Sequence, residues 1–376
     1  MTRKEWVIFP FVAVSLSVIG LFVIYALKPE LFEAQLIAVL VGIGIMIGLA
    51  MVPFPWLVAT APFVGGVSLV FLVMTLASPA VRGAQRWVFL GPVHFQPSEF
   101  VKLALVLMGW WLVVKYPVSR LRRLKSLIMM GLGMGVVLLI IGLQPDLGTA
   151  GFIGMVVGLA SLPLWVNWKR LMVIGMLGLI LVPFGWYQLK PYQKQRVVAF
   201  LDPLSDPKGS GYNIIRALLA IENGGWWGAM GRGGLYQYSL PEAHTDFIFA
   251  VWVEDAGFAG GVFMLGLYGL FLLGLLQVRR KVDRSEEGVL MLIAGFIVIQ
   301  AMFHVGINLG VLPVTGLPLP FVSYGRSSIL VSFALVGVLV SRLRNDYWVG
   351  RDKFKIERIK ELSLQKPDTD KLVHRV

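Results

Sequence analysis

No cysteine occurs among the 376 residues of this chain, and that absence excludes three kinds of chemistry. The protein cannot form disulfides, bind a metal through thiolates or use a cysteine nucleophile. Charge is also scarce, at 15% of residues against about 25% in an average soluble domain. Hydrophobic residues reach 57%, and the mean hydropathy is +0.77. This composition excludes an ordinary soluble domain and predicts a protein that crosses a membrane several times.

Acidic residues are fewer than basic ones, 21 against 34, and the net charge is +13. Such an excess is also typical of nucleic-acid-binding proteins. Here the basic residues follow the loops between apolar runs, so we expect no nucleic-acid partner. The N-terminus runs from Met-Thr-Arg-Lys-Glu-Trp directly into an apolar stretch without a small-residue cleavage site. We therefore expect a first transmembrane helix and not a removed signal peptide.

A membrane-spanning helix needs about 20 mostly apolar residues, and the sequence contains about ten such runs. Their expected bounds are 6–27, 31–52, 56–77, 97–115, 125–143, 147–164, 170–187, 247–276, 288–312 and 327–342. The predicted fold is an all-α polytopic membrane protein with about ten transmembrane helices in residues 1–342. A large loop, 188–246, is expected between the seventh and eighth helices.

The distribution of lysine and arginine sets the expected orientation. With both termini cytoplasmic, the inner loops contain most of the basic loop residues: Lys115, Arg120, Arg122, Arg123, Lys125, Lys169, Arg170, Arg279, Arg280, Lys281 and Arg284. The loop 188–246 is then extracytoplasmic. The charged tail 343–376 is expected to be a partly disordered cytoplasmic segment that contacts anionic membrane lipid.

We place the chemistry in the loop 188–246, because ionisable residues at a membrane edge are costly and usually functional. Residues 209–221 have the apolar spacing of a short amphipathic helix at the interface and include Arg216. The loop ends in Pro-Glu-Ala-His-Thr-Asp, which brings three ionisable residues to the start of the next helix: Glu242, His244 and Asp246.

Glu254 follows Asp246 by eight residues, close to two helical turns, so the two carboxylates are expected on one helix face beside Asp255. Three acidic residues next to lipid favour a water-filled cavity. Together with His244 they also suit a divalent cation such as Mg or Mn, although the spacing is not that of a zinc site. Another interpretation stays open, in which the carboxylate of Asp246 is only the N-cap of the following helix. Thr245 is an alternative N-cap residue for the same helix.

Two more clusters lie at predicted helix starts. Glu99 and Lys102 share a helix face at i, i+3, which fits a local ion pair, while a cation inside an apolar run also fits phosphate binding. Asp146 is expected to cap the helix that begins at residue 147, and its turn can still line a cavity. Residues 308–328 contain three prolines, which exclude a continuous helix and predict an irregular outer loop along a cavity.

Five motifs follow one another along the chain: Gly83-Ala84-Gln85-Arg86-Trp87, Phe95-Gln96-Pro97-Ser98-Glu99, Gln144-Pro145-Asp146-Leu147-Gly148-Thr149, the segment 241–250, and the segment 318–325. Together they resemble the SEDS family (shape, elongation, division and sporulation). The first motif is more similar to its elongation branch, RodA, than to its division branch, FtsW. The resemblance implies a peptidoglycan glycosyltransferase that polymerises lipid II at the outer face of the bacterial cytoplasmic membrane and works with a class B penicillin-binding protein.

The resemblance also implies that the essential acidic residue of the family is Asp246, and that its Arg, Glu and Lys of the third-to-fourth helix region are Arg86, Glu99 and Lys102. As a hypothesis from the chemistry of the reaction, we expect Asp246 to be the general base that accepts the proton of a sugar 4-hydroxyl as that oxygen attacks an anomeric carbon. Residues expected at the substrate are Arg86, Glu99, Lys102, Asp146, Arg216, His244 and Ser323, with Glu242, Glu254 and Asp255 as secondary acidic groups. Two interpretations of Arg326 stay open: its added volume crowds the motif, or its guanidinium contacts the leaving pyrophosphate.

Two positions depart from the family pattern. Arg326 stands where the family usually has the second glycine of Ser-Tyr-Gly-Gly-Ser-Ser, and Asp255 stands where it usually has a second Glu. Other functions also use these residues: a lipid II flippase or transporter, a division-type polymerase, or a scaffold for cell-wall proteins. Ionisable residues that gather toward the outer side favour outer-face chemistry over transit.

Overall fold

The computed structural model describes residues 6–80, 84–91, 93–115, 120–165, 187, 191–205, 210–229, 240–280, 282 and 284–344. In this part of the chain, six helices are long and apolar enough to cross a membrane: Ile8–Leu27, Pro29–Met51, Pro97–Lys115, Ile248–Arg279, Glu286–Asn308 and Arg326–Arg344. Shorter apolar helices cover Ala61–Ala77, Gly131–Leu143 and Leu147–Ser161. The chain is therefore an integral membrane protein, while the count of ten spans stays a prediction. Most of the predicted span 170–187, and the tail beyond residue 344, lie outside the described residues.

Helices make up nearly all of the regular structure. They are α1 Ile8–Leu27, α2 Pro29–Met51, α3 Phe54–Ala59, α4 Ala61–Met74, η1 Thr75–Ala77, α5 Pro97–Lys115, α6 Arg120–Leu143, α7 Leu147–Trp165, α9 Pro191–Leu201, η2 Pro203–Ser205, α10 Ser210–Gly224, α11 Ile248–Arg279, α12 Arg284–Ala294, the π-helix Gly295–Ile299 and α13 Gln300–Asn308. A last helix follows at Arg326–Arg344. The strands β1 Val88–Leu90 and β2 Val93–Phe95 pair antiparallel, so the all-α prediction missed one hairpin.

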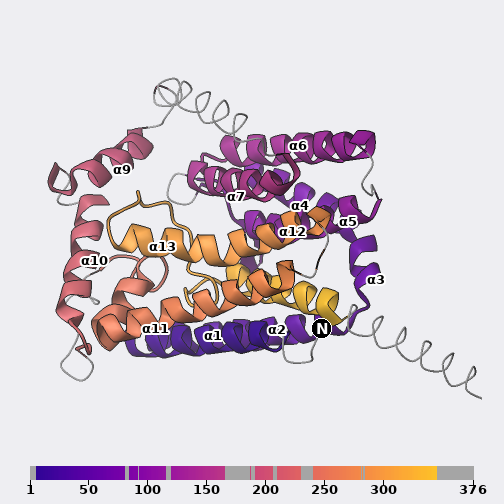
Figure 1. Cartoon of the computed structure of the whole chain (residues 1–376). Helices are drawn as coiled ribbons and strands as arrows, with labels where there is room; N and C mark the ends of the chain where they lie inside the picture. The colour runs from indigo at the N-terminus through magenta and orange to yellow at the C-terminus, as the bar shows by residue number, and fades with distance from the viewer. Residues whose placement is uncertain are drawn as a thin grey trace, which may run out of the picture.

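The long helices lie side by side in one bundle (Figure 1). Helix α1 packs against α2 and α11, while α12 packs against α5 and α7. The last helix is the most enclosed of the candidate spans, with 83% of its apolar window buried, against 28% for α2. The apolar residues that α2 leaves exposed, such as Ile37 and Leu40, suit contact with lipid, where an exposed apolar side chain carries no penalty.

Helices α9 and α10 lie across one end of the bundle, and the described N-terminus lies at the other (Figure 1). The amphipathic helix predicted at 209–221 is confirmed as α10, which buries Ile214, Ala217 and Ala220. Gly224 lets α10 approach α11 closely, because a Cβ there would lie 2.0 Å from the Val253 carbonyl oxygen.

Candidate active site

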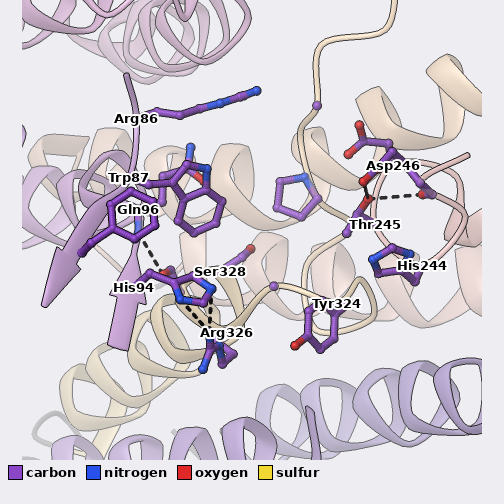
Figure 2. A pocket seen from close by; sticks show the side chains of 16 residues that line it. Arg86, Trp87, His94, Gln96, His244, Thr245, Asp246, Tyr324, Arg326 and Ser328 are labelled. Carbon is purple, nitrogen blue, oxygen red and sulfur yellow. Dashed lines mark hydrogen bonds between the residues drawn. The ribbon is translucent and has the colours of Figure 1, made fainter. Parts of the chain in front are cut away.

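A cavity of about 400 Å³ opens between three segments that are far apart in sequence. Its lining comes from the β-hairpin region, the turn before α11 and the loop between α13 and the last helix: Arg86, Trp87, Phe89, His94, Gln96, Glu242, His244, Thr245, Asp246, Gly316, Pro318, Tyr324, Gly325, Arg326, Ser327 and Ser328. Figure 2 shows the hairpin residues on one side and Asp246 on the other. We call this space the Asp246 cavity.

The carboxylate of Asp246 does not cap α11. That helix begins at Ile248, and its N-cap residue is Phe247, without a side-chain hydrogen bond. Asp246 belongs to a turn in which the carbonyl of Glu242 accepts hydrogen bonds from the amides of Thr245 and Asp246, both at 3.0 Å. Glu242 itself has the left-handed backbone angle φ = 57°, an unusual conformation for a non-glycine residue. The capping interpretation is therefore wrong for Asp246, whose half-buried carboxylate lines the cavity.

Asn308, at the end of α13, supplies the missing cap from a neighbouring helix. Its Oδ1 accepts a hydrogen bond from the amide of Ala250 at 3.0 Å, in the first turn of α11. Its Nδ2 donates to the carbonyl oxygens of Asp246 at 3.0 Å and His304 at 2.8 Å. Asn308 was not among the residues predicted to be functional; its only signal in the sequence is a polar residue at the end of an apolar run.

The irregular loop predicted after α13 is confirmed, and polar side chains hold it in place. His304 Nδ1 donates to the Leu317 carbonyl at 3.0 Å, and Gln300 Nε2 donates to the Pro318 carbonyl at 2.8 Å. Ser323 Oγ donates to the Thr245 carbonyl at 2.7 Å and so ties the loop to the turn that carries Asp246. Ser323 is buried and does not belong to the cavity lining, so the structure gives it a positioning contact.

Arg86 connects the Asp246 cavity to a second cavity of about 230 Å³. In that second cavity Asp146 lies 3.7 Å from Arg86 Nη1, and it also caps α7 by accepting from the amide and hydroxyl of Thr149. Both expectations for Asp146, a cap and a cavity lining, are confirmed. A Cβ on Gly316 would lie 3.6 Å from Arg86 Nη1 and 3.8 Å from Asp246 Oδ2, so this glycine keeps open the space between the two charges.

Glu99 and Lys102 form a buried ion pair at 2.6 Å, with side chains 4% and 2% exposed. Lys102 also donates to Gln300 Oε1 at 2.8 Å, and Gln300 in turn holds the loop at Pro318. Neither charged residue belongs to the lining of the Asp246 cavity. The local ion pair expected from the spacing is confirmed, and a direct contact with substrate stays a prediction.

Three other candidates lie away from the cavity lining. Asn223 of α10 donates to Glu254 Oε1 at 2.9 Å, and Glu254 and Asp255 are both buried within the protein. The expected common face with Asp246 is wrong, because helical spacing starts only at Ile248. Arg216 stacks on the ring of Tyr212, 5.0 Å from its centroid. Among the described residues, no group of three or more His, Cys, Asp or Glu is placed to hold a metal ion.

His94 and Arg326 meet at the lower edge of the cavity in Figure 2. Arg326 Nη2 lies 2.7 Å from His94 Nε2, and since a guanidinium can only donate, the imidazole is the acceptor. Burial, and then the charge of Arg326, lower the pKa of His94 below its usual value of 6.5. His244 also lines the cavity, and its ring lies 5.7 Å from the ring of Tyr324.

The fold and the site define an integral membrane protein with a charged cavity bounded by a hairpin and two loops. The sequence profile of the FtsW/RodA/SpoVE family, described as a cell cycle protein, matches residues 4–347. The chain therefore belongs to the FtsW/RodA/SpoVE family.

Relatives in this family carry an enzymatic name. The chain is 36% identical over 326 residues to the peptidoglycan glycosyltransferase MrdB of Escherichia coli K12, covering 83% of this chain and 85% of that protein. It is 39% identical over 282 residues to the probable peptidoglycan glycosyltransferase FtsW of a Synechocystis species, covering 72% of this chain and 69% of that protein.

Solved structures agree with this membership. One shows the structural coordination of polymerization and crosslinking by a peptidoglycan synthase complex; it has a TM-score of 0.76 and 33% identity, covering 89% of this chain and 97% of the other. The crystal structure of RodA from Thermus thermophilus has a TM-score of 0.65 and 29% identity to this chain, covering 90% of this chain and 96% of the other.

Proposed function

We propose that this chain is a peptidoglycan glycosyltransferase that polymerises lipid II into glycan strands. The names of the relatives support the activity, and one observation carries the assignment of the site. Asp246 lines a cavity, and a neighbouring helix takes over the capping task that its carboxylate would otherwise perform.

In the proposed step, the 4-hydroxyl of one lipid-linked sugar attacks the anomeric carbon of another. The new C–O bond forms while the bond to pyrophosphate breaks, and the configuration at that carbon inverts. Asp246 accepts the hydroxyl proton, a contribution typically worth about 10²–10⁴ in rate. The pyrophosphate leaves with the electron pair of the broken bond and needs nearby positive charge. A requirement for Mg or Mn stays a prediction.

The site is proposed to face the outside of a bacterial cytoplasmic membrane, with both chain termini in the cytoplasm. The bias of lysine and arginine toward the predicted inner loops supports this orientation. The likeness to MrdB and RodA, together with the Gly83–Trp87 motif, supports a role in elongation over division. The similar peptidoglycan synthase complex coordinates polymerization with crosslinking, which supports a class B penicillin-binding protein as the partner of this chain.

Substitution of Asp246 tests the proposal. Asp246→Asn keeps the size of the side chain and removes its basicity, so we expect polymerisation of fluorescent lipid II by purified protein and its partner to fall at least about 10²-fold. Asp202→Asn is the matched control, because this exposed carboxylate also lies in the outer segment and outside the cavity lining. Near-normal polymerisation by a folded Asp246→Asn protein would refute the assignment of the base.

A further inference from the structure

Two arginines, Arg86 and Arg326, line the described part of the Asp246 cavity, and their charges are not equally available. The guanidinium of Arg86 lies 3.7 Å from the carboxylate of Asp146, which offsets its charge. Within the described ranges, Arg326 has no carboxylate partner and instead donates to His94. A neutral imidazole that accepts this hydrogen bond orients the guanidinium but leaves its positive charge intact.

The last helix starts at the same wall of the cavity. Residues Gly325 to Ser328 belong to the cavity lining, and the helix Arg326–Arg344 has 19 residues. A helix start carries partial positive charge and amides that can bind an anion. The backbone amide of Gln96 donates a hydrogen bond to Ser327 Oγ at 3.1 Å, which fixes the hairpin against this helix start.

Ser328 gives an independent sign of a missing ligand. It lines the cavity, its residue is 5% exposed, and its Oγ has no hydrogen-bond partner in the described part of the chain. A buried hydroxyl without a partner is uncommon, because its desolvation is not compensated. A ligand oxygen in the cavity would supply the acceptor that this hydroxyl lacks.

We propose that Arg326, Ser328 and this helix start form a phosphate-binding subsite of the Asp246 cavity. The proposal deepens the proposed function and rests on it: the subsite takes the pyrophosphate of a lipid-linked sugar. The guanidinium matches two phosphate oxygens in a bidentate fashion, and the serine hydroxyl donates to another. Asp246 lies across the cavity from Arg326 (Figure 2), so the anion is kept apart from the negatively charged base.

The test uses the full chain in nanodiscs of phosphatidylcholine, with inorganic pyrophosphate as the probe. Thermal stabilisation by pyrophosphate is measured for the wild type, Arg326→Gln, Arg326→Lys and Ser328→Ala, and the Michaelis constant for lipid II is measured in parallel. We expect Arg326→Gln to raise the pyrophosphate concentration needed for half-maximal stabilisation, and the Michaelis constant for lipid II, by about tenfold or more. Arg326→Lys and Ser328→Ala should give values between those of Arg326→Gln and the wild type. Arg279→Gln is the control, since Arg279 pairs with Glu287 at the end of α11 and lies outside the cavity lining.

The outcomes separate the subsite from the enzyme. If the wild type polymerises lipid II and Arg326→Gln changes neither the pyrophosphate response nor the Michaelis constant, the subsite is wrong and the proposed function stands. If the wild type binds pyrophosphate through Arg326 but makes no glycan with its partner, the proposed function fails and phosphate binding survives. A parallel series in nanodiscs with phosphatidylglycerol tests a lipid headgroup: an effect of Arg326→Gln that appears only there would overturn the assignment to substrate.

Discussion

The side chain of Asn308 holds both Asp246 and the first turn of α11 in place. Asn308→Ala removes this side chain without altering the residues that it holds. Two donated hydrogen bonds disappear, to the carbonyls of Asp246 and His304, together with one accepted from the amide of Ala250. Asn308 has no exposed surface, so water cannot easily replace these bonds. The carbonyl of Asp246 and the amide of Ala250 then lose their fixed positions.

The size of the effect follows from these contacts. A hydrogen bond contributes about 0.5–1.5 kcal/mol net, and a buried donor left without a partner costs about 1–3 kcal/mol. We therefore expect Asn308→Ala to lower the free energy of unfolding by about 2–4 kcal/mol. Catalysis should suffer separately, because a misplacement of about 1 Å in a catalytic group can cost on the order of 100-fold in rate. We expect kcat to fall about 10- to 100-fold, with KM for lipid II changed by less than about twofold.

The assay is lipid II polymerisation at a temperature where the variant remains folded, with thermal unfolding measured on the same sample. Ser341→Ala is the control, because Ser341 is also buried and donates a hydrogen bond to the Val52 carbonyl at 2.7 Å, outside the cavity lining. A general loss of stability would slow both variants in proportion to their unfolding. Normal kcat in a destabilised Asn308→Ala protein would refute the idea that this residue positions Asp246.

Two further substitutions test neighbouring contacts. Gly316→Ala puts a methyl group 3.8 Å from Asp246 Oδ2 at a residue with φ = 77°, so polymerisation should fall at least about tenfold. Gly310→Ala is the control, because Gly310 has φ = 66° and lies away from the cavity lining. It should lower thermal stability through the same backbone strain but keep the polymerisation activity. Lys102→Met leaves Glu99 as an unpaired buried charge and should cost about 3–5 kcal/mol in thermal unfolding, which a second change, Glu99→Gln, should largely restore. If the restored double variant is stable but cannot polymerise lipid II, the pair serves the site and not stability alone, either by contact with substrate or through the bond from Lys102 to Gln300.

The membrane character and the position of Asp246 were predictable because both depend on local patterns. Long apolar runs identify spans, and an ionisable residue beside them is costly wherever the chain folds. Asp146 was predicted correctly for the same reason, since a capping residue acts within three residues of itself. In contrast, Asn308 acts across 58 residues on Ala250 and 62 on Asp246, a relation that no local pattern contains.

The error at Glu254 has a different cause. Its spacing from Asp246 predicts a common face only if one helix contains both residues, and the turn at Glu242 delays the helix until Ile248. The carbonyl of Glu242 satisfies three successive amides, including that of Phe247, so the turn is stable without helical geometry. Glu254 is then directed to Asn223 and joins α10 to α11.

The π-helix at Gly295–Ile299 explains how one long span serves both packing and the site. Before it, α12 packs against α7, and at Gly295, the first residue of the π-helix, a Cβ would lie 2.3 Å from Val156 Cγ1. After it, α13 presents polar side chains at four-residue intervals toward the Asp246 turn and the following loop: Gln300, His304 and Asn308. One extra residue in a helical turn rotates the following residues by about 100° relative to an uninterrupted α-helix. The face of α12 that packs against α7 and the polar side chains of α13 can therefore point in different directions. These buried polar side chains bond to backbone groups, and those bonds hold the walls of the Asp246 cavity in place.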